Sequence, residues 1–480
     1  MAERIDCDVL IAGGGPTGVT LAVLLAQRGV RVVVAEKEAD IYPLPRAAHL
    51  DHEAIRILQE VGVAGEVMAT SRRSPRYDFL TAAGEILLRF EGSDRIGSGG
   101  WPAANMIHQP SVEAALRRRL AGLPGAQLHS RWEMTGWSDD GAGVTATLST
   151  PDGPQEIRAA WLVGADGARS PVRHAAGIAF DDLGFEEPWL VVDTIVHDAA
   201  RLPDANLQIC DPARPTTCVL MGEGRHRWEF MILPGESAEE VASDASVGQL
   251  LKPWNVEGAV TLERKAVYTF RARIAQQWRK GRVLLAGDAA HQTPPFAGQG
   301  MCSGLRDAAN LGWKLAAIVN DGAGMDLLST YQTERAPNLR ATIDMAVMMG
   351  RTVCITDPQA AAARDAQMLA ARAAGHSPDG TVEYPPIGDG LILTGSPGAG
   401  AYFPQPVADE ARLDDVLGAG YWLIDRAALE RAELAAFREA LAGWLDTHQA
   451  EAVLVRPDRY VFGTGRAGDL ADAWAAALRA

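Results

Sequence analysis

The sequence predicts a mixed α/β fold, with a βαβ unit near the N-terminus, a run of short strands joined by turns in the middle and a small α/β unit at the C-terminus. A glycine-rich loop joins an apolar strand to an apolar helix within residues 8–28. Four short β-rich segments follow one another over residues 189–233, and short apolar runs alternate with helical stretches over 421–480. The 480 residues, of which 47% are hydrophobic, suffice for more than one core.

Composition excludes several classes of partner. A formal net charge of −16 argues against general affinity for nucleic acid or an anionic membrane surface, because both need clustered Lys and Arg. The five cysteines form no C-x-x-C pair, which fits neither a disulfide framework nor a zinc site. The N-terminus lacks a signal-peptide pattern, and no apolar run is long enough to span a bilayer. We therefore predict a cytoplasmic protein with a small-molecule partner, no metal and no membrane or nucleic-acid partner.

The first motif is the G-x-G-x-x-G of residues 13–18, which follows the strand 8–12 and opens a helix over 19–28. In such a loop Gly13 permits a tight turn, Gly15 lets a diphosphate approach the backbone, and Gly18 lets helix and strand pack closely. The helix N-terminus adds N–H donors and positive potential. The loop is typical of a dinucleotide site.

The continuation of the chain supports this interpretation. A second strand over 31–35 ends at Glu36, near the ~20-residue spacing at which an acid accepts ribose hydroxyls. Because strand, loop, helix, strand and acid occur in order, a ligand-free glycine turn is a poor alternative. The similar pattern at 463–468 lies too close to the C-terminus for a returning strand, so we interpret it as a strand-to-helix turn. The chain thus shows one dinucleotide motif.

Two further motifs lie downstream. In WLVGADGARSPVR (161–173) a strand ends at Asp166-Gly167. In the segment 281–315 a buried strand over 283–286 leads into Gly287-Asp288, a Pro- and Gly-rich loop follows, and a long helix begins near Cys302.

These three ordered motifs resemble those of the class A single-component FAD-dependent aromatic hydroxylases, whose fold is that of p-hydroxybenzoate hydroxylase. The similarity runs from about Asp8 to about Arg340 and returns at 454–464, and it is closest to the branch of 3-(3-hydroxyphenyl)propionate hydroxylase and the aromatic polyketide hydroxylases. The resemblance implies a Rossmann-like FAD-binding domain, an inserted antiparallel-sheet substrate domain and a thioredoxin-like C-terminal module. The implied units are 1–180 with 265–350 (FAD-binding), 181–264 with part of 70–110 (substrate sheet), 351–400 (helix and linker) and 401–480 (thioredoxin-like).

The resemblance also implies the residues that contact the cofactor. Asp288 can accept from a ribityl hydroxyl, while the 298–300 turn and the helix after it place N–H donors at the flavin pyrimidine edge. Arg46 and Gln109 fall on flavin-contact positions, although Arg46 alone could be a surface cation. The predicted set is Gly13, Gly15, Pro16, Thr17, Gly18, Glu36, Lys37, Arg46, Gln109, Asp166, Asp288, Pro295, Gly298, Gln299, Gly300, Met301 and Cys302.

Two members of this set have qualified roles. We expect Asp166 to have a structural and a nicotinamide-contact role. Cys302 stands where many relatives have Asn, so the side-chain contact is in doubt while the backbone donor is kept. We interpret Cys302 as a packed small residue in preference to a reactive thiol.

The segment 226–233 predicts a strand with two different faces. Alternation puts Trp228, Phe230 and Ile232 on one face and Arg227, Glu229 and Met231 on the other. Because aromatic-binding cavities are mainly apolar, we predict a substrate cavity lined by residues such as Leu220, Trp228, Phe230 and Pro295. Packing of these residues against helices is an equal alternative.

The C-terminal part predicts a helix over 344–372, a linker rich in Pro and Gly over 376–400, and then a small α/β unit. In that unit we expect a helix over 429–447 between the strands 421–425 and 452–456. Without C-x-x-C it cannot exchange dithiols, so a structural or dimer-contact role is expected, which leaves a homodimer open.

The resemblance implies a monooxygenase in which NADH or NADPH reduces FAD and O2 reacts to a C4a-hydroperoxyflavin that hydroxylates a phenolic ring. The protein must position the ring, exclude water and aid loss of the phenolic proton. The candidate bases are His49, His52, His226 and His291, and none is assigned. The same fold could instead catalyse dehydrogenation or epoxidation, or bind FAD without turnover. The phenol, its regiochemistry and the choice of NADH or NADPH are not predicted.

Overall fold

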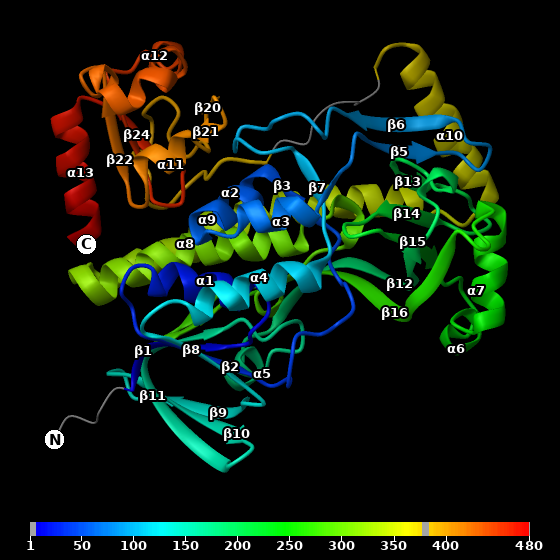
Figure 1. The fold of residues 1–480 in the computed structure, drawn as a ribbon, viewed down its shortest axis with the longest axis horizontal. Coiled ribbons are helices and arrows are strands. Elements are labelled where there is room, and N and C mark those ends of the chain that lie inside the picture. The colour runs from blue at the N-terminus through cyan, green and yellow to red at the C-terminus, as the bar shows by residue number, and fades with distance from the viewer. Residues whose placement is uncertain (1–5, 377–383, 480) are drawn as a thin grey trace.

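A computed structural model describes residues 6–376 and 384–479 of the chain. Figure 1 shows a first sheet at the bottom beneath α1 (Pro16–Ala26) and α8 (Gly300–Asp321), a second sheet to the right, and a C-terminal unit at the upper left. This arrangement confirms the mixed α/β fold. In the described ranges no helix is long and apolar enough to cross a membrane, and no group of His, Cys, Asp and Glu is placed to hold a metal ion.

The first sheet has the order β17-β18-β11-β1-β2-β8. β1 pairs in parallel with β11 and β2, and β2 pairs in parallel with β8, as the βαβ motif predicts. Its strands are β1 (Cys7–Ala12), β2 (Val32–Glu36), β8 (Ala126–Ser130), β9 (Glu133–Asp139), β10 (Val144–Thr150), β11 (Gly153–Gly164), β17 (Arg279–Lys280) and β18 (Val283–Leu285).

Both helices that follow the glycine motifs begin earlier in the sequence than predicted. α1 begins at Pro16 and not at Val19, because proline at the first helical position needs no partner for an N–H. α8 begins at Gly300, two residues before Cys302. The two helices lie side by side, with the space at Gly312 filled by Leu24 of α1 (Figure 1).

The second sheet has the order β19-β16-β12-β15-β14-β13-β5-β6. β5, from the N-terminal part of the chain, pairs in parallel with β13, and the expected boundary at 264/265 falls inside β16. The domain boundaries stay a prediction. The strands are β5 (Arg76–Leu80), β6 (Ile86–Glu91), β12 (Phe180–Val196), β13 (Asn206–Ile209), β14 (Thr216–Leu220), β15 (Arg225–Met231), β16 (Val260–Ala275) and β19 (His291–Gln292).

One face of this sheet packs against α6 (Ala238–Val241) and α7 (Asp244–Leu251), which Figure 1 shows at its right-hand side. The other face, here called the inner face, points toward the FAD-binding part: the Arg227 guanidinium donates from it to the carbonyl oxygens of Pro45 and Arg46, each at 2.7 Å. A small third sheet has the order β3-β7-β4 and is formed by β3 (His49–Asp51), β4 (Arg72–Arg73) and β7 (Ala104–Met106). Further helices of these parts are α2 (His52–Val61), α3 (Ala64–Thr70), α4 (Gln109–Ala121) and α5 (Pro171–Ala175).

The helix predicted over 344–372 is in fact two helices. α9 (Ser329–Val353) ends, and α10 (Pro358–Ala373) begins with Pro358 while the Asp357 side chain accepts from the Ala360 N–H. An N-cap followed by proline starts a new helix, and this signal was overlooked. Part of the predicted linker, residues 377–383, lies outside the described residues.

The C-terminal unit contains the antiparallel sheet β22-β23-β24, with α12 (Arg438–Thr447) and α13 (Ala467–Arg479). Its strands are β22 (Trp422–Asp425), β23 (Ala452–Val455) and β24 (Val461–Gly465), and the short α11 (Leu413–Leu417) precedes them. The helix predicted over 429–447 was too long, because 3-10 turns occupy its first half. The pattern at 463–468 is a strand-to-helix turn, as predicted.

Candidate cofactor and substrate site

The glycine loop after β1 has two crowded positions and one open position. Gly13 has φ +106°, and a Cβ there would lie 2.3 Å from the carbonyl oxygen of Ala165. A Cβ on Gly18 would lie 2.1 Å from the carbonyl oxygen of Gly13, whereas a Cβ on Gly15 would meet no heavy atom within 4 Å. Gly13 and Gly18 are thus required by packing, and Gly15 leaves the backbone open at the α1 N-terminus. This cradle fits the diphosphate of FAD.

Glu36 lies against this loop. Its carboxylate accepts from the Gly14 N–H at 2.6 Å and from the Glu38 N–H at 2.7 Å, which places it at the end of β2 where a ribose would bind. Arg117 of α4 donates to the Gly14 carbonyl at 3.1 Å and adds positive charge beside the loop. Sequence reasoning missed Arg117, because one arginine in a helix gives no local signal. Lys37 is exposed.

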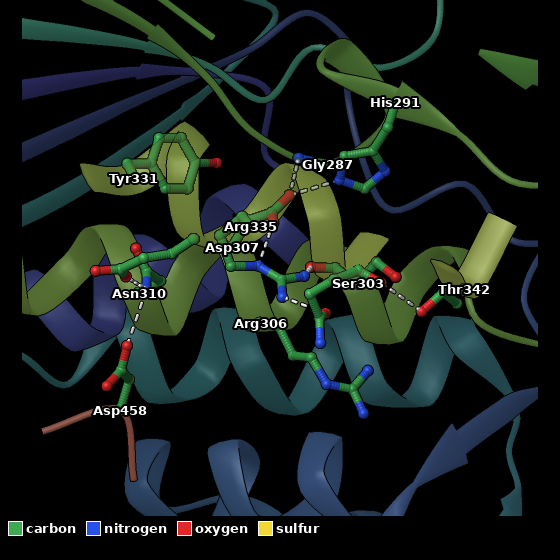
Figure 2. Close-up of polar contacts among 12 residues, drawn as sticks. Gly287, His291, Ser303, Arg306, Asp307, Asn310, Tyr331, Arg335, Thr342 and Asp458 are labelled. Carbon is green, nitrogen blue, oxygen red and sulfur yellow. Dashed lines mark hydrogen bonds and ion pairs between the residues drawn. The ribbon is translucent and has the colours of Figure 1, made fainter. Parts of the chain in front are cut away.

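The Gly287-Asp288 turn is held from below by Asp307 of α8 (Figure 2). The buried Asp307 carboxylate accepts from the Gly287 N–H at 3.0 Å, lies 2.6 Å from His291 Nε2 and pairs with Arg335 at 3.0 Å. Asp288 itself is reached by solvent, yet burial of its surroundings raises the pKa of its carboxyl while His291 and Arg46 lower it. This suits a carboxyl that faces a polar ligand. Sequence reasoning missed Asp307, because α8 also contains other charged residues such as Arg306 and Lys314, so one more acid gives no local signal.

The 298–300 turn and the start of α8 show which groups can face a ligand. Gly298 has φ +64°, and a Cβ on Gly300 would meet no heavy atom within 4 Å. The Gln299 side chain is directed into a buried cluster, where it donates to the Tyr384 hydroxyl at 2.8 Å and accepts from Arg306 at 3.2 Å. Only the backbone of Gln299 is therefore available to a flavin.

Cys302 is fully buried, with its Sγ 3.8 Å from the carbonyl oxygens of His49 and Gly298. Burial holds the pKa of its thiol well above the usual range, so the residue packs and does not react. Met301 and Pro295 are half-buried in the same segment. Thr17 of α1 lies against α8, since a Cβ on Gly304 would lie 2.3 Å from Thr17 Oγ1.

The side chains of Gln109 and Asp166 each accept a hydrogen bond from a backbone N–H group. Gln109 accepts from the Ala47 N–H at 2.6 Å and so fixes the loop that contains Arg46. Arg46 is exposed, with its guanidinium 5.3 Å from the Tyr42 ring centroid. Asp166 accepts from the Val172 N–H at 3.0 Å in the first turn of α5, and burial raises the pKa of its carboxyl. This is the structural part of its expected role; the nicotinamide contact stays a prediction.

The inner face of the second sheet bears a hydrogen-bonded chain that ends at the flavin turn. Thr217 donates to Gln208 at 2.7 Å, Gln208 donates to the Tyr77 hydroxyl at 2.6 Å, and that hydroxyl donates to the Phe296 carbonyl at 2.8 Å. Phe296 lies two residues before Gly298. We call this surface the inner wall: it comprises Tyr77, Gln208, Thr217 and Glu229, together with Trp189, Phe270 and Phe296. The Phe296 ring packs edge to face against Trp189 at 5.6 Å and against Phe270 at 5.9 Å.

The predicted substrate residues of β14 and β15 lie on the opposite face. Trp228 and Phe230 are buried in a core with Val241 and Val247 of α6 and α7. Leu220 shares their face by alternation. Trp228 and Phe230 therefore pack against helices, and the role of Leu220, Trp228 and Phe230 in a substrate cavity stays a prediction that this packing does not support. The sequence separated the faces, but it could not show which one faces the FAD-binding part.

The four candidate histidines have other contacts. His226 lies on the helix-packed face with Nε2 2.9 Å from Cys218 Sγ, and burial lowers its pKa to about 3. His291 is paired with Asp307, and His52 accepts from the Gly99 N–H at 3.1 Å. His49 lies 3.1 Å from the Gly298 carbonyl, at the flavin turn, and burial lowers its pKa. No candidate among these four belongs to the inner wall.

Comparison with known proteins shows the family to which the chain belongs. Residues 6–346 match the family described as "FAD binding domain", and residues 428–480 match the "HcaD C-terminal domain". The chain is 38% identical over 504 residues to the "Probable NADH-specific resorcinol 4-hydroxylase" of Rhodococcus jostii (strain RHA1), covering 97% of this chain and 93% of the relative. It is 35% identical over 527 residues to the "3-(3-hydroxy-phenyl)propionate/3-hydroxycinnamic acid hydroxylase" of Mycobacterium sp. (strain JLS), covering 96% and 89%.

Among solved structures, the ternary complex of aklavinone-11 hydroxylase with FAD and aklavinone superimposes with a TM-score of 0.76 at 26% identity, covering 99% of each chain. The family match spans the glycine loop, Glu36, Asp288 and the α8 N-terminus, which are the groups that fit FAD. The chain belongs to the single-component FAD-dependent aromatic hydroxylases.

Proposed function

We propose that this flavoprotein monooxygenase acts on a small phenol of the resorcinol type, with NADH as the preferred reductant. One observation supports it most: the inner wall is joined to the flavin turn by the Tyr77–Phe296 hydrogen bond, so a ring held at the wall would lie beside the cofactor. The relative named as an NADH-specific resorcinol 4-hydroxylase, 38% identical over nearly the whole chain, supports the substrate and the reductant.

Different residues of the site contact different parts of FAD in this proposal. The backbone at Gly15 and the α1 N-terminus hold the diphosphate, Glu36 the ribose and Asp288 the ribityl chain, while the α8 N-terminus stabilises negative charge on the ring system. FAD, when bound, supplies electron storage and oxygen activation. The inner wall positions the phenol and excludes water, which is what the chain itself must contribute.

The test is a substrate panel on the purified protein with FAD. Resorcinol, 3-hydroxyphenylpropionate and a larger phenolic polyketide are each supplied with NADH or NADPH, and nicotinamide oxidation, O2 uptake and product mass are followed. We expect resorcinol with NADH to give the highest rate and a product heavier by one oxygen atom. Oxidised product without added oxygen would favour dehydrogenation, and an epoxide would favour the other alternative. Absence of flavin reduction under all conditions would favour binding of FAD without turnover.

The cytoplasmic location and the homodimer stay predictions, because none of these contacts bears on them.

A further inference from the structure

Glu229 is the acidic residue of the inner wall, and among the described residues its carboxylate has one ion-pair partner, at long range. The residue is 5% exposed, and its nearest cation is Arg227, with Nη1 3.7 Å from Oε1. Within the described ranges the nearest donor to the Glu229 carboxylate is this Arg227 nitrogen, which lies beyond hydrogen-bond distance. The Glu229 oxygens are not among the fully enclosed polar atoms that lack a partner, so they stay reachable and can accept a hydrogen bond from a ligand.

The neighbouring Asp193 carboxylate, in contrast, is paired with arginine side chains. Asp193 of β12, which is fully buried, receives the Arg227 Nε at 2.6 Å and also faces Arg264 at 3.4 Å. Arg227 is further engaged with the Pro45 and Arg46 carbonyls. The cation next to Glu229 is therefore already bound to other oxygens, and Glu229 keeps acceptor capacity on the inner wall.

The charged and titratable groups that face Glu229 come from three strands. Burial raises the pKa of Glu229 to about 7, Arg227 on the same strand lowers it and Asp193 on β12 raises it. On β5, burial raises the pKa of the Tyr77 phenol, and the Glu229 charge adds to that effect. Thr217 of β14 is the cross-strand neighbour of Glu229, and it is neutral. Glu229 can thus gain and lose a proton near neutral pH, as a general base must.

We propose that Glu229 contacts the substrate: it accepts a hydrogen bond from an un-ionised ring hydroxyl, takes its proton, and disfavours rings that present a carboxylate at that position. This inference rests on the proposed function and specifies the class of phenol. A resorcinol-type ring offers neutral hydroxyl donors. A ring carboxylate at that position would lie close to the Glu229 carboxylate in a partly desolvated site. The repulsion between the two negative charges would weaken binding.

The proton transfer balances as follows. The phenolic O–H bond breaks and an O–H bond forms on Glu229, while the electron pair stays on the phenolic oxygen and enriches the ortho and para ring carbons. NADH supplies a hydride and the solvent supplies one proton, while O2 supplies one oxygen atom to the new ring hydroxyl and one to water. When the ring regains aromaticity its carbon loses a proton, which is taken up in forming water, and Glu229 returns its own proton to the phenolic oxygen.

The experiment compares wild type with Glu229→Gln, Glu229→Asp and the control Glu263→Gln. Glu263 lies on β16 and is paired with Arg225 at 2.8 Å, so the control makes the same chemical change outside the inner wall. The measured quantities are FAD content, the rate of NADH-dependent hydroxylation of resorcinol against pH, and the fraction of reduced oxygen released as hydrogen peroxide.

For Glu229→Gln we expect FAD to be retained and hydroxylation to fall about 10²-fold, the lower end for loss of a general base. Wild type should show a rate that rises with pH through about 7, as Glu229 loses its proton, and the Gln variant should lose this step. Glu229→Asp should keep the step with a lower rate, and Glu263→Gln should match wild type. An unchanged rate and pH profile in Glu229→Gln would overturn the role of Glu229 while leaving the proposed function intact.

A second measurement needs no variant and guards against misfolding. The dissociation constants of resorcinol and 3-hydroxybenzoate for wild type are obtained from the change in flavin absorbance on either side of pH 7. We expect 3-hydroxybenzoate to bind at least about tenfold more weakly at the higher pH, where Glu229 is charged, and resorcinol to bind equally well. Equal pH dependence of both ligands would contradict the inference. If wild type hydroxylates no phenol at all, the proposed function fails instead.

Discussion

The FAD site and the inner wall differ in how far apart their residues lie in the sequence. At the FAD site, Gly13, Gly15 and Gly18 lie within six residues, and each has a steric or electrostatic reason that a short motif can express. The inner wall combines Tyr77, Gln208 and other residues from separate strands, which come together only when β5 pairs with β13. A short motif can therefore predict a cofactor site, whereas a wall made by strand pairing needs the sheet order.

The largest effect should come from Gly15→Val at the FAD site. Because a Cβ at this position meets no protein atom within 4 Å, the variant should fold, yet its side chain would fill the space needed by the diphosphate. We expect a colourless protein with native circular dichroism. Gly13→Val is the matched contrast, since its Cβ would clash with the Ala165 carbonyl and the fold itself should suffer. Full flavin content in Gly15→Val would show that the N-terminal site is assigned wrongly.

On the second sheet, Trp228→Ala should separate stability from substrate binding. Trp228 is fully buried against α6 and α7, so truncation should reduce the free energy of unfolding by about 3–5 kcal/mol. The KM for the phenol should change little at a temperature where the variant is folded. Urea unfolding and steady-state kinetics check both quantities. A large rise in KM with unchanged stability would restore Trp228 as a substrate contact.

A smaller effect is expected from Glu36→Ala. The variant loses a carboxylate that holds the Gly14 and Glu38 N–H groups and would bind ribose hydroxyls, so FAD should bind more weakly by about 1–3 kcal/mol. Titration of the apoprotein with FAD measures this change. Unchanged affinity would mean that Glu36 only supports the loop.

The smallest effect concerns stability against pH. The pKa of Glu229 is raised in the folded protein from 4.5 to about 7, so wild type loses stability as pH rises across this window. Glu229→Gln should therefore gain in Tm relative to wild type when pH is raised from about 5 to about 8, on the order of 2 °C. Parallel Tm curves for the two proteins would contradict the raised pKa.

Much of the FAD site could be predicted from the sequence, because local motifs specify it. The roles of Gly15, Glu36 and Asp288 stand as predictions that the geometry fits, whereas Asp307 lacked a motif although it fixes the Gly287 turn. The inner wall could not be predicted, since alternation separated Trp228 from Glu229 without showing which face met the FAD-binding part. That choice depends on long-range packing.

The central claim is that the inner wall and the FAD site work together on one phenol. Anaerobic stopped-flow mixing of the FAD-loaded protein with NADH, with and without resorcinol, tests it most directly. A bound ring should stabilise the arrangement in which cofactor and nicotinamide meet, so we expect reduction to accelerate at least several-fold. If neither resorcinol nor any phenol of a broad panel changed the rate of flavin reduction from its value without a phenol, the result would contradict the account.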